Sequence, residues 1–247
     1  MSGLTVILPC AGKGTRLGLP YPKEMHLVSE KTALIDFTFN RLERDAHLIK
    51  EVVVILSPEK GSLVEYLSKW RHKFYIKFIF FDENNFEWAG SILSAEKEFG
   101  ERNIIFLPDS YLVGLPHLPI LATFNNLLSN SGVCFGLLPE ADRERLLALG
   151  AVKVEADSVV TFCDKPALTD SREFNAFWTT FGFTKEMGRP LLEMMTRSIQ
   201  RENVSLKDLG VEASCFEVAQ YKDLGVWPNI HEFTRQIDAS TRIMPEN

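Results

Sequence analysis

Residues 5–25 read TVILPCAGKGTRLGLPYPKEM. The opening residues of this stretch are apolar or β-branched and predict a short strand, which leads into a turn that holds Gly12 and Gly14. Because glycine lets other atoms approach the backbone closely, successive N–H groups in such a loop can point at a bound phosphate. Arg16 and Lys23 follow and supply the positive charge that a polyphosphate needs. The stretch therefore predicts a strand followed by a phosphate-binding loop.

This loop differs from the two standard phosphate-binding loops. A Walker loop has Lys-Ser/Thr directly after its last glycine, whereas Gly14 is followed by Thr15 and Arg16. The dinucleotide fingerprint has a third glycine and opens straight into a helix, which the prolines that follow disfavour. A dehydrogenase is therefore disfavoured. An ordinary turn would explain the two glycines alone, but the added Thr15, Arg16 and Lys23 favour a nucleotide site.

The overall composition is typical of a folded globular protein. The chain has 247 residues, of which 45% are hydrophobic and 24% charged, enough for one large α/β domain or two small ones. A net charge of −6 argues against a general nucleic-acid binder. The sequence shows no signal peptide and no run of membrane-spanning length, so we expect a cytoplasmic protein that binds neither membranes nor nucleic acids. The four cysteines are widely spaced and are expected to be reduced core thiols.

Apolar strand-like runs alternate with helical patterns through the first half of the chain. Strands are predicted at 6–8, 52–56, 75–81 and 103–107, and helices at 33–44, 63–70 and 91–99. Such strand–helix–strand units predict a layered α/β fold with a mainly parallel mixed sheet. The second half is less regular, with strands predicted at 133–138, 151–154, 159–162 and 211–218 and helices at 189–200 and 230–237. No repeat or linker interrupts the sequence, so we expect a single domain over 1–247.

A carboxylate follows one of the predicted buried strands directly. Asp109 ends the run Phe106-Leu107-Pro108. Ligands of parallel sheets gather at the carboxyl ends of the strands, where the glycine loop also lies. Mg²⁺ prefers few protein ligands together with phosphate oxygens, so an aspartate at this edge is a candidate magnesium ligand. For an isolated aspartate, a solvated turn position is the more common situation.

The glycine loop resembles the signature of a known family. Ala11-Gly12-x-Gly14-Thr15-Arg16-Leu17, followed by Pro22-Lys23, is similar to the signature of the sugar-phosphate nucleotidylyltransferases, which join an NTP to a sugar 1-phosphate. The usual form has two adjacent glycines at its start, whereas here one glycine precedes Lys13. The resemblance implies nucleotide contacts by residues of the strand and the loop: Leu8, Ala11, Gly12, Gly14 and Thr15.

Three later segments resemble further motifs of this family, in the same order. Gly150 resembles the glycine against which a sugar ring lies, and Asp164-Lys165-Pro166 resembles a Glu-Lys-Pro motif that contacts the sugar and its phosphate. Asp223, two residues before Gly225, resembles the second metal ligand beside Asp109. Asp164 replaces the usual Glu, and valine follows Gly225 where threonine is usual.

The segment expected to face the nucleobase resembles the family less closely. Gly90 and Ser91 resemble the glycine-rich start of a helix at the base, with Phe86 and Trp88 as candidate stacking rings. Family members that favour dTTP or UTP often carry a glutamine shortly after this glycine, which is missing here. The sequence therefore leaves the base undetermined.

The resemblance implies a GT-A-like α/β fold, with an NTP-binding half over 1–130 and an acceptor-binding half over 131–247. It implies transfer of NMP from an NTP to a phosphorylated small molecule, a sugar 1-phosphate, with release of pyrophosphate and formation of an NDP-sugar. Arg16 would stabilise the leaving pyrophosphate, Lys23 the α-phosphate and Lys165 the acceptor phosphate, with Mg²⁺ as cofactor. The oligomeric state, including a homo-oligomer, is left open.

Three alternatives remain at this stage. A cytidylyltransferase would transfer CMP to a phosphorylated alcohol or a phosphonate, which the short chain and Asp164 keep open. A glycosyltransferase of similar fold would need an Asp-x-Asp pair, and Tyr111 stands where its second aspartate would be. A nucleotide sensor without catalytic activity could have lost several of the charged residues, yet Arg16, Lys23 and Asp109 are all present.

Overall fold

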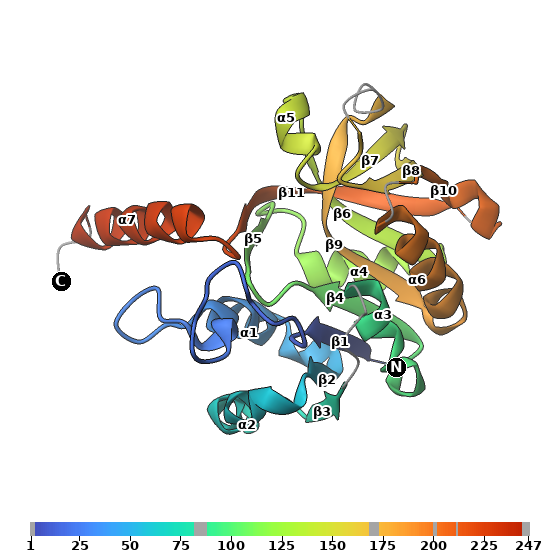
Figure 1. Ribbon diagram of the computed structural model, residues 1–247. Coiled ribbons are helices and arrows are strands. Elements are labelled where there is room, and N and C mark those ends of the chain that lie inside the picture. Colours follow the sequence, from blue (N-terminus) through green and yellow to red (C-terminus); the bar gives the residue numbers. More distant parts are fainter. Residues whose placement is uncertain (1–2, 82–87, 168–172, 200–201, 211, 244–247) are drawn as a thin grey trace.

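The computed structural model describes residues 3–81, 88–167, 173–199, 202–210 and 212–243. Within this part the chain forms one mixed sheet of eleven strands with helices on both faces (Figure 1). The strands are β1 (Leu4–Pro9), β2 (Ile49–Leu56), β3 (Ile76–Phe80), β4 (Arg102–Phe106), β5 (Ser110–Gly114), β6 (Val133–Pro139), β7 (Gly150–Glu155), β8 (Ser158–Asp164), β9 (Ala176–Thr184), β10 (Val204–Ser205) and β11 (Ala213–Asp223). The helices are α1 (Leu34–Arg44), α2 (Gly61–Leu67), α3 (Trp88–Leu93), α4 (Ile120–Leu127), α5 (Arg143–Leu146), α6 (Lys185–Ile199) and α7 (Trp227–Ile243).

The two halves of the sheet are built differently. The order is β10-β8-β11-β6-β9-β4-β1-β2-β3, with β5 paired to β11 and β7 to β8 and β9. β3, β2, β1 and β4 are parallel neighbours. On the other side β9 is antiparallel to both β4 and β6, and among the remaining pairings only β6 with β11 is parallel. The α/β prediction is confirmed, but the expectation of a mainly parallel sheet holds only for the first half.

The hydrophobic core consists of two layers, one on each face of the sheet. Side chains of a strand point to alternate faces, so Val6 and Leu8 of β1 enter one layer and Ile7 enters the other. Residues of α1, α2 and α4 complete the first layer, and residues of α3 and α6 the second. β1 is covered on both faces, which explains why Val6, Ile7 and Leu8 are consecutive apolar residues instead of alternating with polar ones. A smaller cluster joins Leu17 to the start of α7, which projects away from the sheet (Figure 1).

Most of the predicted elements are present, with shifted ends. Two predicted helices are shorter than expected: α2 stops at Leu67 before a 3₁₀ turn, and α3 runs from Trp88 to Leu93. The strand β9 was not predicted, nor were β5, β10, α4 and α5. Two predicted ends, Gln200 and Val211, lie outside the described residues.

No helix in the described ranges offers an apolar stretch long enough to cross a bilayer. Cys10 and Cys134 are packed in the core, as expected, and burial raises the pKa of both thiols.

Candidate active site

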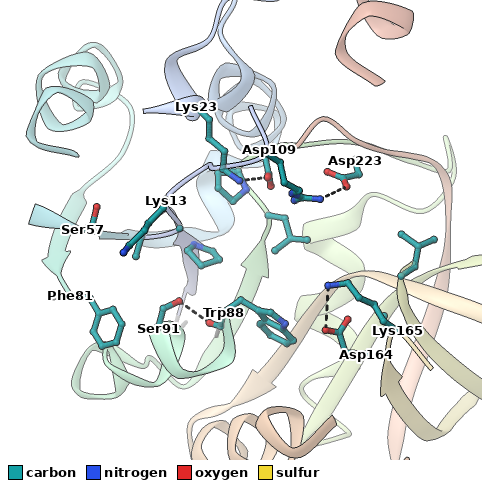
Figure 2. A pocket seen from close by; sticks show the side chains of 18 of the residues that line it. Lys13, Lys23, Ser57, Phe81, Trp88, Ser91, Asp109, Asp164, Lys165 and Asp223 are labelled. Carbon is teal, nitrogen blue, oxygen red and sulfur yellow. Dashed lines mark hydrogen bonds and ion pairs between the residues drawn. The ribbon is translucent and has the colours of Figure 1, made fainter. Parts of the chain in front are cut away.

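A cavity of about 490 Å³ opens at the edge of the sheet where β1 and β4 end. It gathers most of the predicted site residues: Ala11, Gly12, Arg16, Lys23, Ser91, Asp109, Gly150, Asp164, Lys165 and Asp223. Figure 2 shows Lys23, Asp109 and Asp223 on one side of it and Asp164 and Lys165 on another. Residues more than 200 positions apart in the sequence, such as Lys13 and Asp223, therefore line the same cavity.

The glycine loop lines this cavity with its first residues. Ala11 and Gly12 border it directly, and a β-carbon on Gly12 would meet nothing within 4 Å. Gly14 has a φ of +68°, and a β-carbon there would come within 3.3 Å of the Lys23 side chain. Leu17 donates its N–H to the carbonyl of Gly14 at 3.0 Å, which closes the turn. The loop thus brings backbone to the cavity and, through Gly14, leaves room for Lys23 beside it.

Lys23 forms an ion pair and hydrogen bond with Asp109 (Figure 2). Lys23 lies in a 3₁₀ turn, Lys23–Met25, and Asp109 follows β4, as the sequence predicted. Only 14% of each side chain is exposed. Burial by itself lowers the pKa of Lys23, but the charge and hydrogen bond of Asp109 outweigh it and raise this pKa above 10.5. Lys23 is therefore a fixed positive charge at neutral pH.

A second ion pair, Arg16 with Asp223, lies next to the pair of Lys23 with Asp109. Arg16 Nη1 lies 3.7 Å from Asp223 Oδ2. A β-carbon on Gly225 would lie 2.8 Å from Arg16 Nη2, 2.9 Å from Asp223 Oδ1 and 3.1 Å from Asp109 Oδ2. The N–H of Gly225 also donates to Asp223 Oδ1 at 2.8 Å. The two carboxylates and the guanidinium converge on one small space that only glycine leaves open.

This donor set fits a magnesium ion. Mg²⁺ is usually held by one or two carboxylates and completes its shell with water and substrate phosphate oxygens. Asp109 and Asp223 present oxygens to the same space, and no group of three or more acidic, cysteine or histidine side chains gathers in the described part of the chain. Such a pair suits a metal that arrives with a polyphosphate rather than one enclosed by protein ligands.

The opposite wall is formed by the ends of β7 and β8. Gly150 pairs with Asp164 in their antiparallel register. Lys165 follows with a φ of +53°, a left-handed conformation that is uncommon for lysine, and its N–H donates to the carbonyl of Leu149 at 2.9 Å. Lys165 Nζ lies 4.0 Å from Asp164 Oδ2 and its side chain is largely exposed. The predicted hairpin therefore places a lysine on a constrained backbone beside the cavity.

A third side of the cavity lies near the start of α3. Ser91 lines it and donates its hydroxyl to the carbonyl of Trp88 at 2.7 Å. Ser57 and Phe81, from the ends of β2 and β3, line the same side, as Figure 2 shows. Neither was predicted from the sequence, although both follow strands whose carboxyl ends lie at this edge.

Several predicted residues lie beside the cavity without lining it. The Leu8 side chain is wholly buried in the core, and Gly90 is buried in α3. Gly14 and Thr15 belong to the loop but are not among the residues that line the cavity. Phe86 falls outside the described residues, as does Glu87. Tyr111 packs against Phe37 and Phe233, with ring centroids 5.6 and 4.7 Å away, and does not line the cavity.

A buried ion pair next to the glycine loop, Lys60 with Glu24, was not predicted from the sequence. Lys60 Nζ donates to both carboxylate oxygens of Glu24, at 2.8 and 2.9 Å, and to the carbonyl of Cys10 at 2.6 Å. Only 7% of the Lys60 side chain and none of that of Glu24 is exposed. Glu24 follows Lys23, and Cys10 precedes Ala11, so one ammonium group links the two segments that carry the loop and its lysine. Glu24 and Lys60 are 36 positions apart, so no local sequence pattern predicts this pair.

The solved structures that share this fold over nearly the whole chain include the following three. Apo UDP-glucose pyrophosphorylase has a TM-score of 0.78 at 16% identity, with 98% of this chain and 100% of that chain covered. A protein from Bacillus anthracis described as a glucose-1-phosphate thymidylyltransferase has a TM-score of 0.75 at 15% identity, with 99% and 98% covered. UTP-bound UGPase from Acinetobacter baumannii has a TM-score of 0.75 at 14% identity, with 97% and 94% covered.

A scan of protein-family models and a search of curated proteins gave no match. Because the three sequences are only 14–16% identical to this chain, the structural likeness shows that the fold is shared and no more. The resemblance stated from the sequence motifs is therefore confirmed in fold, over a single α/β unit that spans the chain.

Proposed function

We propose that this chain is a nucleotidylyltransferase that transfers NMP from an NTP to a sugar 1-phosphate, releases pyrophosphate and forms an NDP-sugar. The observation that carries the proposal is the convergence of Lys23–Asp109, Arg16–Asp223 and Lys165 on one cavity. In this proposal the fold is GT-A-like, residues 1–130 bind the NTP and residues 131–247 bind the acceptor. The structural neighbours described as a pyrophosphorylase, a thymidylyltransferase and a UTP-bound protein support it.

The reaction requires positioning and charge neutralisation more than proton transfer. An oxygen of the acceptor phosphate attacks the α-phosphorus in line, a new P–O bond forms, and the bond from the α-phosphorus to the bridging oxygen breaks as pyrophosphate leaves with the electron pair. The attacking oxygen is already anionic at neutral pH, so no general base is needed. None of the described residues that line the cavity is a histidine, which agrees with this route.

Three of the cations that line the cavity have roles in this proposed reaction. Lys23, which pairs with Asp109, would contact the α-phosphate and would stabilise the charge that develops there. Arg16, more exposed at the loop, would hold the leaving pyrophosphate with its planar guanidinium. Lys165 would hold the acceptor phosphate in line with the α-phosphorus. Asp109 and Asp223 would hold Mg²⁺, which would neutralise triphosphate charge when bound.

The proposal is tested by pyrophosphate release, measured for each NTP with Mg²⁺ against sugar 1-phosphates, phosphorylated alcohols and phosphonates. We expect Lys23→Ala and Asp109→Ala to lower kcat by roughly 10²–10³, the loss typical of one stabilising contact to a developing charge. Lys153→Ala is the matched control, since it removes an exposed lysine that pairs with Glu155 away from the cavity. Near-wild-type rates in the Lys23 or Asp109 variant would refute the mechanism.

A second candidate acceptor class is a phosphorylated alcohol or a phosphonate, with the same chemistry at the α-phosphorus. One observation favours it: the indole of Trp178 fills space on the acceptor side of the cavity, beside Gly150. If folded protein binds NTP but releases no pyrophosphate with any acceptor, the chain is instead a nucleotide sensor.

A further inference from the structure

The start of α7 contacts segments that form the proposed NTP side of the cavity, although the helix projects away from the sheet (Figure 1). Trp227, the first residue of α7, donates from its indole Nε1 to the carbonyl of Leu17 at 3.0 Å. Leu17 directly follows Arg16, and its own N–H donates to the carbonyl of Gly14 at 3.0 Å. Both polar backbone atoms of Leu17 are therefore bound, one of them by a side chain 210 positions later in the sequence.

The same indole lies against the turn that carries Lys23. Its ring contacts the ring of His26 edge to face, with 5.1 Å between the two centroids. His26 follows the 3₁₀ turn Lys23–Met25, and its N–H donates to the carbonyl of Lys23 at 2.9 Å. One side chain of α7 thus contacts both of the segments whose cations are proposed to bind the triphosphate.

A second side chain of α7, Asn229, contacts the strand end that carries Asp223. Its Nδ2 donates to the carbonyl of Asp223 at 2.7 Å, and the N–H of Gly225 donates to the carboxylate of the same aspartate at 2.8 Å. The N–H of Leu224 donates to the carbonyl of Asp109 at 2.8 Å, which joins the backbones of the two candidate metal ligands. These bonds fix the backbone at Asp223 and therefore the direction of its carboxylate.

Apolar packing joins the start of α7 to the loop and to the end of β11. Four side chains of one small cluster, each at most 5% exposed, supply this packing: Leu17, Leu224, Ile230 and Phe233. An ion pair of Lys222 with Glu232, 2.9 Å apart, adds a polar contact between β11 and α7. The hydrogen bonds of Trp227 and Asn229 are therefore made by a helix that is itself held in place.

We propose that the start of α7 positions the NTP side of the cavity through these two side chains. Trp227 orients the segments of Arg16 and Lys23 that bind the triphosphate, and Asn229 orients Asp223 as a ligand for Mg²⁺. This inference rests on the proposed nucleotidyl transfer. Neither Trp227 nor Asn229 lines the cavity, so each acts through the residues that it holds. Partners behind a metal ligand typically contribute roughly 10–100-fold to metal affinity or activity.

The test uses one conservative change at each position. Trp227→Phe keeps a ring beside His26 and removes the indole N–H, and Asn229→Ala removes the side-chain amide. The matched controls remove a bond of the same kind elsewhere. Trp70→Phe removes an indole N–H that donates to Asp36 at 3.3 Å, and Asn130→Ala removes an amide that donates to a backbone carbonyl at 3.3 Å.

Two measurements are made on each folded variant, well below its Tm. Isothermal titration calorimetry gives the Kd of the α,β-methylene analogue of the NTP that the wild type uses, with and without Mg²⁺. Pyrophosphate release gives kcat and the KM of the acceptor. Both side chains are only partly buried and both changes shorten them, so we expect the variants to fold.

We expect Asn229→Ala to raise the Kd measured with Mg²⁺ and to lower kcat, each roughly tenfold, while the Kd without Mg²⁺ stays the same. Trp227→Phe should raise the Kd about three- to tenfold with or without Mg²⁺, the value of one hydrogen bond. The KM of the acceptor should stay the same in both, and the controls should leave every one of these constants unchanged.

An active wild type together with unchanged Kd and kcat in both α7 variants overturns the positioning, even where their Tm falls, because a purely structural role would lower Tm alone. A wild type that binds no analogue and releases no pyrophosphate overturns the nucleotidyl transfer, and the positioning with it.

Discussion

At the scale of single residues, the pairing of Lys23 with Asp109 determines how the site responds to pH. A lysine whose pKa is raised in the folded state stays charged until the pH approaches that pKa, and the ion pair loses its stabilising energy only as the pH rises through it. For Lys23 this pKa lies above 10.5. A free acceptor phosphate is dianionic above about pH 6. We therefore expect kcat to be flat from about pH 7 to 10.

A pH–rate profile of the wild type with saturating substrates checks this expectation. A descending limb with a midpoint between pH 8 and 9.5 that disappears in Lys23→Arg would show that Lys23 titrates within the working range, contrary to the pairing with Asp109. Lys153→Arg, a change at an exposed lysine, is the control.

The crowded surroundings of Gly225 allow a second prediction at this scale, on the effect of adding a β-carbon there. Alanine there would press on Arg16, Asp109 and Asp223 at 2.8 to 3.1 Å, closer than ordinary van der Waals contact. We expect Gly225→Ala to displace the carboxylates and to lower kcat by roughly 10²-fold, as for other losses of charge stabilisation. Circular dichroism should stay close to that of the wild type.

Gly61→Ala provides a matched glycine-to-alanine control. A β-carbon on Gly61 meets nothing within 4 Å, and its φ of −54° is ordinary for a helix start. This variant should keep full activity and the same or slightly higher Tm. Full activity in Gly225→Ala would mean that the two carboxylates do not act together.

The residues of the site were predictable from sequence to different degrees. Lys23, Asp109 and Asp223 follow strands or turns with recognisable order, so motifs located them and the structure brings them to one cavity. Trp178 carries no local signal, because the glycine that it lies beside is 28 positions earlier and becomes its neighbour only after folding. Contacts between distant positions are the part of a site that one sequence does not display.

At the scale of elements, two 3₁₀ turns are joined by the buried pair Glu24 and Lys60. The turns are Lys23–Met25 and Pro58–Lys60, and the shared ammonium also binds the carbonyl of Cys10 at 2.6 Å. Lys60→Met would leave Glu24 buried without its partner, which costs about 3–5 kcal/mol. For a chain of this size, that loss lowers Tm by roughly 6–20 °C.

Thermal unfolding followed by circular dichroism measures this effect. Adding Glu24→Gln to Lys60→Met should recover part of the lost stability, because the unpaired carboxylate is then removed. Lys153→Met breaks an exposed pair and should change Tm little. Equal Tm for Lys60→Met and the wild type would show that the pair does not hold the two turns together.

β9 shows why the sheet could be predicted only in part. The first-half strands are short apolar runs separated by helical patterns, and their parallel order follows from that alternation. β9 is a run of nine residues, AFWTTFGFT, in which threonines and a glycine interrupt the apolar pattern. The two strands with which it pairs most extensively, β4 and β6, precede it by more than 35 residues, so this antiparallel pairing depends on non-local contacts.

At the scale of the whole molecule, β9 makes the two halves of the chain interdependent. Arg102–Phe106 of β4 pairs with Thr184–Thr180 of β9, so the edge of the parallel half is completed by a strand from the second half. One core layer is shared as well, since Ile7 and Ile105 belong to the same cluster as Phe135 and Phe181. The proposed functional boundary near residue 130 therefore does not coincide with a boundary in the core.

We therefore expect residues 1–130, produced alone, not to form a stable monomer. Without β9 the fragment exposes the backbone of β4 along one edge and the apolar face of Ile7 and Ile105, a combination that favours aggregation. The whole chain should unfold in one transition that coincides by fluorescence and circular dichroism. Size-exclusion chromatography and urea unfolding of the fragment beside the whole chain make the comparison. A monomeric fragment with a cooperative transition of its own would show that the parallel half is an independent domain, and the shared core layer would then contribute little to its stability.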